Sequence, residues 1–186
     1  VTVDGYDILR NPEEVKKRIG YLPENPPLYM DMTVKDYLNF VFDLKKVKIN
    51  REEHLNEIMS LVKISDVSHR LIKNLSKGYK QRVGIAQALI GNPEILIFDE
   101  PTVGLDPKQI NEIRNMIKKL GKQRTIILSS HILPEVSAIC ERVIIINKGK
   151  IVASDTLENI TNNLSNSNEI TAVIEGIKDE VMRILS

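Results

Sequence analysis

The chain has 186 residues, and its 26 Lys and Arg residues are balanced by 25 Asp and Glu residues, which leaves a formal net charge of +1. This length can bury a substantial core in one large domain, or in a domain with an appendage, and the near-neutral charge gives no electrostatic case for a nucleic acid partner. The single cysteine, Cys140, excludes an internal disulfide and fits a reducing compartment, and no apolar run approaches the roughly 20 residues of a membrane-spanning helix. Val1 begins neither a signal peptide nor an initiator-methionine terminus, so we expect a soluble piece of a larger protein.

The first part of the chain predicts a hairpin, a short helix and a strand. Residues 1–3 alternate as a strand does, and the following Asp4-Gly5 is a hairpin-turn pair. Residues 11–18 predict a helix, because an N-capping asparagine is followed by proline in the first turn and by acids that the helix dipole favours. The short apolar run 19–22 predicts a strand that the next proline ends.

Residues 33–75 have a helical pattern, with capped helix starts at their beginning and at Asn50. A further helix is expected from its N-cap, Ser76, to a stop near Gly91. Capping alone would explain Ser76. A helix N-terminus also offers hydroxyl and backbone N–H donors to an anion, and Gly78 would let a ligand approach the backbone closely.

The apolar run 95–98, Ile-Leu-Ile-Phe, predicts a strand buried on both faces of a parallel sheet with helices on either side. It ends at Asp99 and Glu100, and open α/β sheets place their ligand crevice at the carboxyl ends of such strands. A metal ligand, Asp99, beside a water-activating base, Glu100, is the pairing that phosphoryl transfer requires. The alternative is that both acids are ordinary loop residues.

A helix is expected from the N-cap Asp106, with proline in its first turn, to Gly121. Residues 124–129 predict another buried strand of the parallel type. His131 then follows at the same edge of the sheet as the two acids. A histidine after a strand is usually structural, but this edge position favours a functional role.

The rest of the chain predicts short elements and a tail. These are a helix over 133–140, strands over 143–146 and 151–153 joined by a turn, a helix from Thr156, a polar linker over 162–168, a strand over 169–175 and a last helix to Leu185. Cys140 belongs to the first of these helices and is expected to be a small core residue.

Four motifs in this order resemble the ATP-binding-cassette (ABC) ATPases. They are LSKGY from Leu75, ILIFDE from Ile95, VGLD from Val103 and the histidine at position 131, and GYLPEN from Gly20 is similar to the family's Q-loop. The stretches GYLPENPPLY and LSKGY look most like exporter subunits of the gliding-motility and multidrug type. The resemblance implies an α/β fold: a P-loop NTPase-type core with a parallel sheet plus an all-helical ABC subdomain.

The chain also departs from the family's pattern. Glu24 stands where the Q-loop glutamine is expected, where it could coordinate a cation, position water or be a plain polar residue. Lys77 replaces the first glycine of the signature sequence, where it could add a cation near phosphate or face water, and Tyr79 replaces its glutamine. No G-x-x-x-x-G-K-[S/T] phosphate loop occurs. The resemblance therefore covers Val1 to about Leu157, and the cassette is expected to be N-terminally truncated.

By this resemblance the cofactors are ATP and Mg²⁺. Asp99 would hold Mg²⁺ through water, Glu100 would orient or deprotonate the attacking water, and His131 would contact the γ-phosphate and sense hydrolysis. The expected cofactor-binding residues are Ser76, Lys77, Gly78, Glu24 and Asp106.

The cofactor-binding residues would act between two subunits. Ser76 and Gly78 would clasp the γ-phosphate bound to the opposite subunit, and Asp106 would connect the two sites. The apolar segment 26–30 would meet the coupling helix of a transmembrane subunit, or serve as an internal hinge.

The resemblance implies an ATP-hydrolysing subunit that powers an ABC transporter through ATP-driven dimerisation, in a fragment that is inactive alone. Its parts would be a partial ATPase core and Q-loop region (1–28), a helical subdomain with the signature helix (29–92), the rest of the ATPase core (93–160), and a linker with the start of a C-terminal accessory domain (161–186). Its partners would be a second ATP-binding subunit and a transmembrane permease, but no nucleic acid. It would lie in the cytoplasm, peripheral to the inner face of the cell membrane. A non-transport ABC ATPase and a truncated, non-catalytic interaction module stay open as alternatives.

Overall fold

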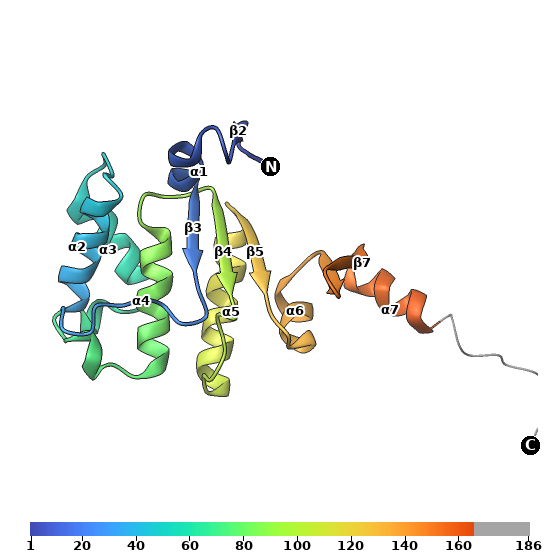
Figure 1. Ribbon diagram of the computed structural model, residues 1–186. Coiled ribbons are helices and arrows are strands. Elements are labelled where there is room, and N and C mark those ends of the chain that lie inside the picture. Colours follow the sequence, from blue (N-terminus) through green and yellow to red (C-terminus); the bar gives the residue numbers. More distant parts are fainter. Residues whose placement is uncertain (166–186) are drawn as a thin grey trace, which may run out of the picture. The chain divides into compact units, whose positions relative to one another are not determined.

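The computed structural model describes residues 1–165, which belong to two compact units, one formed by Val1–Cys140 and one beginning at Glu141. In chain order the first unit contains β1 (Thr2–Val3), β2 (Tyr6–Asp7), α1 (Pro12–Arg18), β3 (Ile19–Leu22), α2 (Val34–Leu44), α3 (Arg51–Leu61), the 3₁₀ turns η1 (Ser65–Val67) and η2 (Ile72–Asn74), α4 (Lys77–Leu89), β4 (Ile95–Asp99), α5 (Pro107–Gly121), β5 (Thr125–Ser129) and α6 (Leu133–Ile139) (Figure 1). The second contains β6 (Val143–Asn147), β7 (Lys150–Asp155) and α7 (Leu157–Ser165).

The first unit is built on a parallel sheet of three strands in the order β3-β4-β5. The three strands end at one common edge, and α4 and α5 begin at that edge and run back beside them (Figure 1). The carboxyl ends of the strands and the N-termini of two helices therefore lie together. The prediction of an α/β fold with a parallel sheet is confirmed.

One face of this sheet packs tightly against helices. Leu22 and Phe98 are fully buried on it, within one hydrophobic core that also includes α2, α3, α4 and α5. A Cβ atom added to Gly20 would lie 2.2 Å from the carbonyl oxygen of Ala88, so glycine is what allows α4 to lie this close to β3.

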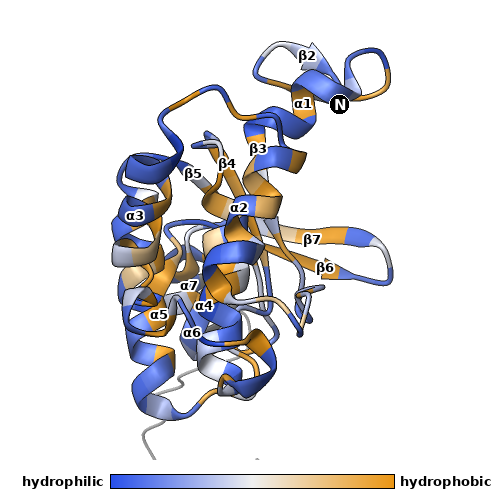
Figure 2. Cartoon of the chain, turned by 90° about the vertical axis from the view of Figure 1, so that its left-hand side faces the viewer, coloured by the Kyte–Doolittle hydropathy of each residue, from blue (hydrophilic) through white to orange (hydrophobic). Residues whose placement is uncertain are grey.

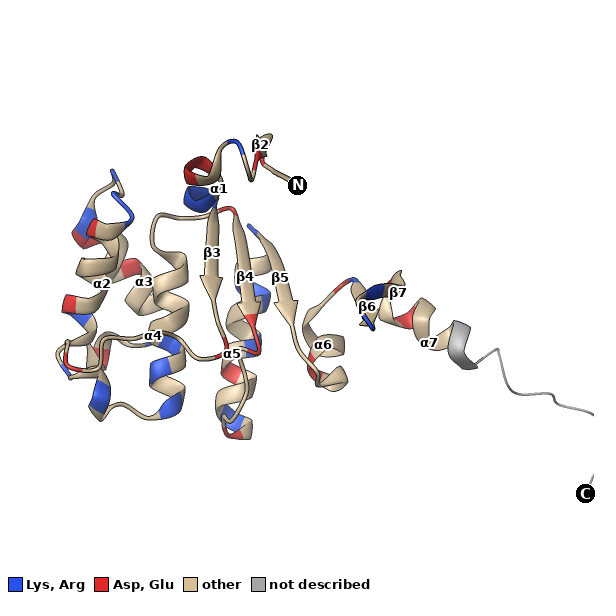
Figure 3. Cartoon of the chain, viewed as in Figure 1, with Lys and Arg blue, Asp and Glu red and all other residues tan. Residues whose placement is uncertain are grey.

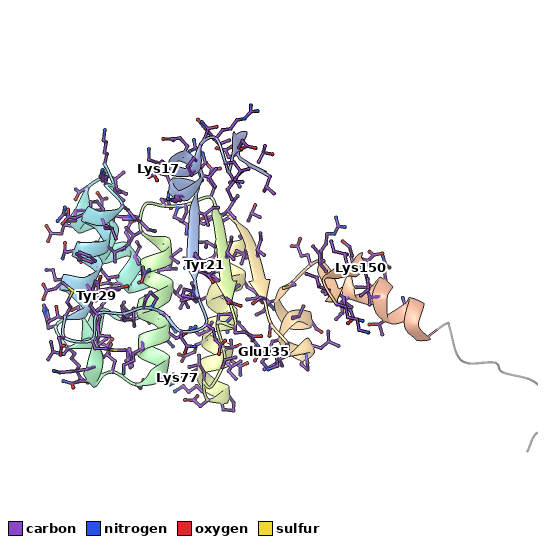
Figure 4. The ribbon with its side chains drawn as sticks, in the orientation of Figure 1. Lys17, Tyr21, Tyr29, Lys77, Glu135 and Lys150 are labelled. Carbon is purple, nitrogen blue, oxygen red and sulfur yellow. The ribbon has the colours of Figure 1, made fainter. Side chains whose placement is uncertain are left out.

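The opposite face of the sheet is open in the described residues. Tyr21, Ile97 and Ile127 lie side by side across the three strands, and Tyr21 and Ile127 are 50% and 54% exposed (Figure 4 labels Tyr21). The sequence predicted that the runs 95–98 and 124–129, which form β4 and β5, are buried within the sheet. That prediction is therefore wrong for this face. An apolar run shows which side chains can be buried, but it carries no information on whether a second layer covers them.

Every element between β3 and β4 is helical, as the sequence predicts. Thr33 Oγ1 and Asn50 Oδ1 accept hydrogen bonds from backbone N–H groups of the first turns of α2 and α3, which confirms both caps. Both helices contain polar and apolar residues (Figure 2), and their buried apolar side chains belong to the hydrophobic core. Lys45 Nζ donates to two carbonyl oxygens at the end of α4, those of Gln87 (3.2 Å) and Ile90 (2.9 Å), and burial lowers the pKa of this lysine to about 8.

The two hairpins have the turns that their sequences predict. Asp4 and Gly5 both have positive φ, at 47° and 77°, and they join β1 to β2. Lys148 and Gly149 have φ values of 48° and 73° between β6 and β7. Two consecutive left-handed residues are the mark of the type I′ turn, whose twist matches that of antiparallel strands.

The second unit corrects one boundary. The helix α7 extends to Ser165, so the start of the predicted linker, at residue 162, is helical instead. Its asparagines lower helix propensity only slightly, and the cluster of polar residues was a weak reason to end the helix. The predicted strand over 169–175 and the last helix lie outside the described residues.

None of the helices within residues 1–165 has both the length and the apolar character that crossing a membrane requires.

Candidate active site

The carboxyl edge of the sheet brings together the three residues expected to carry the chemistry. Asp99 is the last residue of β4 and pairs in register with Ser129, the last residue of β5. The Ser129 hydroxyl donates a hydrogen bond to Asp99 Oδ1, and the Glu100 N–H donates to the Ser129 carbonyl (3.1 Å). In Figure 3 the ribbon is red, the colour of Asp and Glu, at this end of β4. His131 lies two residues beyond Ser129, beside Glu100.

Glu100 is held in an unusual conformation for a residue with a side chain. Its φ of 45° lies in the left-handed region, and such strained positions occur disproportionately at functional sites. The carboxylate is 16% exposed, and its Oε1 accepts a hydrogen bond from the His131 N–H (3.0 Å) and contacts His131 Nδ1 (2.7 Å). Its Oε2 is buried and has no hydrogen-bond partner among the described residues. One carboxylate oxygen is thus fixed, and the other is left to accept a proton or a hydrogen bond from a small molecule.

The contact with Glu100 also affects the protonation of His131. The histidine side chain is 72% exposed, and the hydrogen bond to the Glu100 carboxylate raises its pKa above the ordinary value. When Nδ1 donates to Glu100, Nε2 remains to make a contact of its own.

This arrangement predicts that the pKa of His131 lies above 6.5 and that Glu100→Gln lowers it. A raised pKa means that the pair stabilises the fold fully below the unfolded-state pKa, and this stabilisation is lost as the pH rises through the folded-state pKa. NMR titration of the imidazole Cε1–H resonances measures it, with His54 and His69 as internal references. An unchanged His131 pKa in the Glu100→Gln protein would show that the two side chains do not pair in solution.

Asp99 fits a role as a ligand of Mg²⁺. Among residues 1–165 no group of three or more His, Cys, Asp or Glu side chains could form a complete metal cage. Mg²⁺, however, keeps several waters and is usually held by one or two carboxylates together with substrate phosphates. A single carboxylate beside a hydroxyl group, as in Asp99 and Ser129, suits that pattern.

The N-termini of α4 and α5 form the second part of the site. Ser76 Oγ accepts a hydrogen bond from the Tyr79 N–H (3.3 Å), and Asp106 Oδ1 accepts one from the Gln109 N–H (2.9 Å), so both predicted caps are confirmed. A Cβ atom on Gly78 would lie 2.6 Å from the Gln109 side chain. The close approach at Gly78 in this structure is therefore made by α5.

Lys77 lies against the loop that follows Glu100. The side chain is exposed, and a Cβ atom on Gly104 would lie 2.1 Å from Lys77 Nζ (Figure 4 labels Lys77). The sequence left two roles open for Lys77, a cation near phosphate or a residue that faces water. Facing water does not by itself account for this contact with Gly104. The Lys77 side chain therefore lies close to the backbone of Gly104, in the turn that leads to Asp106.

Further contacts hold α4 in place. The Arg82 guanidinium forms an ion pair with Glu112 of α5 and donates to the Val62 carbonyl (3.0 Å). The Tyr79 hydroxyl donates to Asp66 (2.9 Å), and this bond raises the tyrosine pKa. Tyr79, which replaces the family's glutamine, therefore ties α4 to the neighbouring 3₁₀ turn.

Glu24 follows β3 in an exposed loop. Its charge is one of those that raise the His131 pKa, after the charges of Glu100 and Glu135. The structure shows no direct hydrogen bond from Glu24 to these residues.

Sequence reasoning missed three residues at this edge: Thr102, Ser129 and Glu135. Ser129 had a usable signal, because it is a hydroxyl residue at the end of a strand predicted to lie beside β4. Glu135 also had a weak one, because it lies four residues after His131. Nothing in the sequence indicated the role of Thr102.

Comparisons with known proteins agree with this geometry. A model of the ABC transporter family matches residues 1–103. The chain is 42% identical over 165 residues to the ABC transporter ATP-binding protein NatA of Bacillus subtilis. The aligned region covers 86% of this chain and 66% of that protein. It spans 54% and 50% of the length of two further curated relatives.

Two solved structures have the same fold. The first, an ATP-binding subunit of an ABC transporter, has a TM-score of 0.76 and 28% sequence identity and covers 88% of this chain and 69% of its own. The second, an ATP-binding cassette in a dimeric post-hydrolysis state bound to ADP and Pi, has a TM-score of 0.71 and 23% identity and covers 83% of this chain and 72% of its own.

Proposed function

Because this chain belongs to the ABC transporter family, we propose that it is part of a subunit that binds and hydrolyses ATP to power transport across a membrane. The observation that carries the proposal is the Glu100–His131 pair at the carboxyl edge of the sheet. There, one oxygen of the carboxylate is fixed and the other has no partner among the described residues. A carboxylate held in this way can orient water and accept its proton.

In this proposal each residue of the edge has a separate task. Glu100 Oε2 accepts a hydrogen bond from the attacking water, and His131 Nε2 contacts the γ-phosphate while Nδ1 stays on Glu100. Asp99, oriented by Ser129, would hold Mg²⁺ through water. When bound, Mg²⁺ neutralises the charge on the phosphate oxygens. Glu24 would position water or a cation beside them.

The helix N-termini supply the contacts between subunits in the proposal. Ser76, Lys77 and Gly78 would clasp the γ-phosphate held by a second ATP-binding subunit, since a helix N-terminus favours an anion. Asp106 would connect the two nucleotide sites. The contact between Lys77 and the loop at Gly104 supports this link, because it joins the clasp to the loop that follows Glu100.

An exposed aromatic cluster supports a membrane partner. Tyr29 is 54% exposed, and its ring meets Phe40 edge-on at 5.3 Å and the buried Tyr37 at 6.0 Å (Figure 4 labels Tyr29). Exposed aromatic side chains with one anchored edge are typical of protein interfaces. We assign this cluster to a transmembrane permease, which places the subunit at the cytoplasmic side of the cell membrane. The four-part division of the chain described above belongs to the same proposal.

The 186-residue chain alone is expected to show no saturable ATP binding in the micromolar range and no ATPase activity. The physical reason is that none of its sequence forms the phosphate loop whose backbone N–H groups and lysine cradle the phosphates. Isothermal calorimetry and a phosphate-release assay test this. Micromolar binding by these 186 residues would contradict it.

The complementary experiment uses the full-length protein, meaning the complete product of its gene. ATP hydrolysis by that protein, increased when it is reconstituted with its permease, is the expected result. Hydrolysis that no permease increases would favour a non-transport ABC ATPase, and no hydrolysis at all would favour a non-catalytic interaction module.

A further inference from the structure

A buried carboxylate on α6 has no place in the chemistry described so far. Glu135 is 3% exposed and lies in the first turn of α6, four residues after His131. Its Oε2 accepts a hydrogen bond from the hydroxyl of Thr102, which is also 3% exposed, and its Oε1 forms an ion pair with the Arg114 guanidinium of α5 (3.4 Å). Figure 4 labels Glu135 near the carboxyl edge of the sheet.

The contact between Thr102 and Glu135 joins the same two segments as the contact between Glu100 and His131. Thr102 lies two residues after Glu100, and Glu135 lies four residues after His131. The turn that begins at Glu100 and the segment that begins at His131 are thus joined twice, once by Glu100 with His131 and once by Thr102 with Glu135. The ion pair with Arg114 fixes the second contact to α5 as well.

Such a buried network specifies a position more than it stabilises a fold. Removing a carboxylate from water is costly, and a buried ion pair often contributes no more stability than apolar residues of the same volume. It does fix the relative position of the segments, because the Glu135 carboxylate has both of its partners only when Thr102 and Arg114 are in place.

We propose that Glu135 is a positioning residue, which through Thr102 and Arg114 holds the segment carrying His131 against the turn that follows Glu100. The inference rests on the proposed ATPase function. Without this contact, α6 is free to shift, and His131 and the fixed oxygen of Glu100 no longer share one geometry. In this arrangement a change in the position of His131 also affects the turn that leads to Asp106.

The first test is Thr102→Val in the full-length protein, because valine has nearly the shape of threonine and removes only the hydroxyl donor. We expect kcat to fall by about 10–10²-fold, the cost of a misplaced catalytic group, with little change in the KM for ATP. Thr102→Ser should restore kcat. Thr125→Val is the matched control, since Thr125 is exposed at the opposite end of β5 and the substitution is the same.

The second test needs no nucleotide and uses the 186-residue chain. Thr102→Val removes no charge, so a fall in the NMR-determined pKa of His131 would report that the histidine has moved away from Glu100. The pKa of His54 should stay where it is. Glu135→Gln removes a charge that itself raises the His131 pKa, so its effect is measured as kcat of the full-length protein. There the Thr102→Val/Glu135→Gln double variant should be no slower than Glu135→Gln alone, because both substitutions break the contact between Thr102 and Glu135.

The outcomes separate this inference from the function on which it rests. A Thr102→Val protein with wild-type kcat and an unchanged His131 pKa overturns the positioning role, even if its unfolding temperature is lower. If the wild-type full-length protein hydrolyses ATP and Glu100→Gln abolishes this while Thr102→Val does not slow it, only the positioning role fails. A full-length wild type without ATPase activity overturns both.

Discussion

Replacing Glu100 by Gln in the full-length protein should slow ATP turnover by about 10²–10⁴-fold, the usual contribution of a positioned general base. Glutamine keeps the shape of the side chain, and its amide oxygen can still accept from the His131 N–H. It cannot take a proton from water, however. ATP binding should therefore stay nearly intact, and ATP should hold two subunits together because the step that releases them is blocked.

The measurements are steady-state phosphate release and size-exclusion chromatography with and without ATP. Glu94→Gln is the matched control: Glu94 is an exposed residue immediately before the other end of β4, and its substitution should leave turnover unchanged. If Glu100→Gln kept normal turnover, Glu100 would be an ordinary loop acid, and the unpartnered oxygen at the site would have no catalytic meaning.

Replacing Ser76 by Arg should abolish ATP-driven dimerisation while leaving ATP binding to the monomer largely unchanged. In the proposed assembly each ATP lies between one subunit and the N-terminus of α4 in the other, so an arginine at the cap position puts bulk into a closed interface. Loss of the cap itself is a smaller effect, worth about 0.5–2 kcal/mol of stability. Asn50→Arg separates the two causes, because Asn50 caps α3 and the change removes a cap and adds the same bulk elsewhere.

Mixing two variants of the full-length protein tests whether Ser76 acts on the opposite subunit. One subunit carries Ser76→Arg, and the other lacks its phosphate-loop lysine. Such a pair retains one composite site with both halves intact, so ATP-dependent association should partly return. If the mixture associates no better than either variant alone, Ser76 is only a helix cap.

The sequence predicted the centre of the site because of a simple geometric fact. Parallel strands that pair in register end at one edge, so the acids after residues 95–98 and the histidine after 124–129 had to meet once both runs were assigned to neighbouring strands. The caps at Ser76 and Asp106 were equally readable, since capping depends on a few adjacent residues.

What could not be predicted depends on contacts between distant segments. The contact of Thr102 with Glu135 and that of Lys77 with Gly104 exist only because the tertiary fold places two turns side by side. The exposure of Ile127 was missed for the related reason that a strand's own pattern does not say what covers it.

The helical insertion between β3 and β4 has a consequence for the order of folding. Strand β3 ends at Leu22, but its only partner in the described sheet begins at Ile95, after α2, α3 and α4. Closing so long a loop costs entropy before any strand pair forms, whereas helices gain their contacts locally. Among the described residues, β3 therefore gains its strand partner only after β4 has been synthesised. The helices that separate the two strands shorten this gap by folding first, and a substitution that slowed their formation would expose β3 to aggregation before the nascent chain is complete.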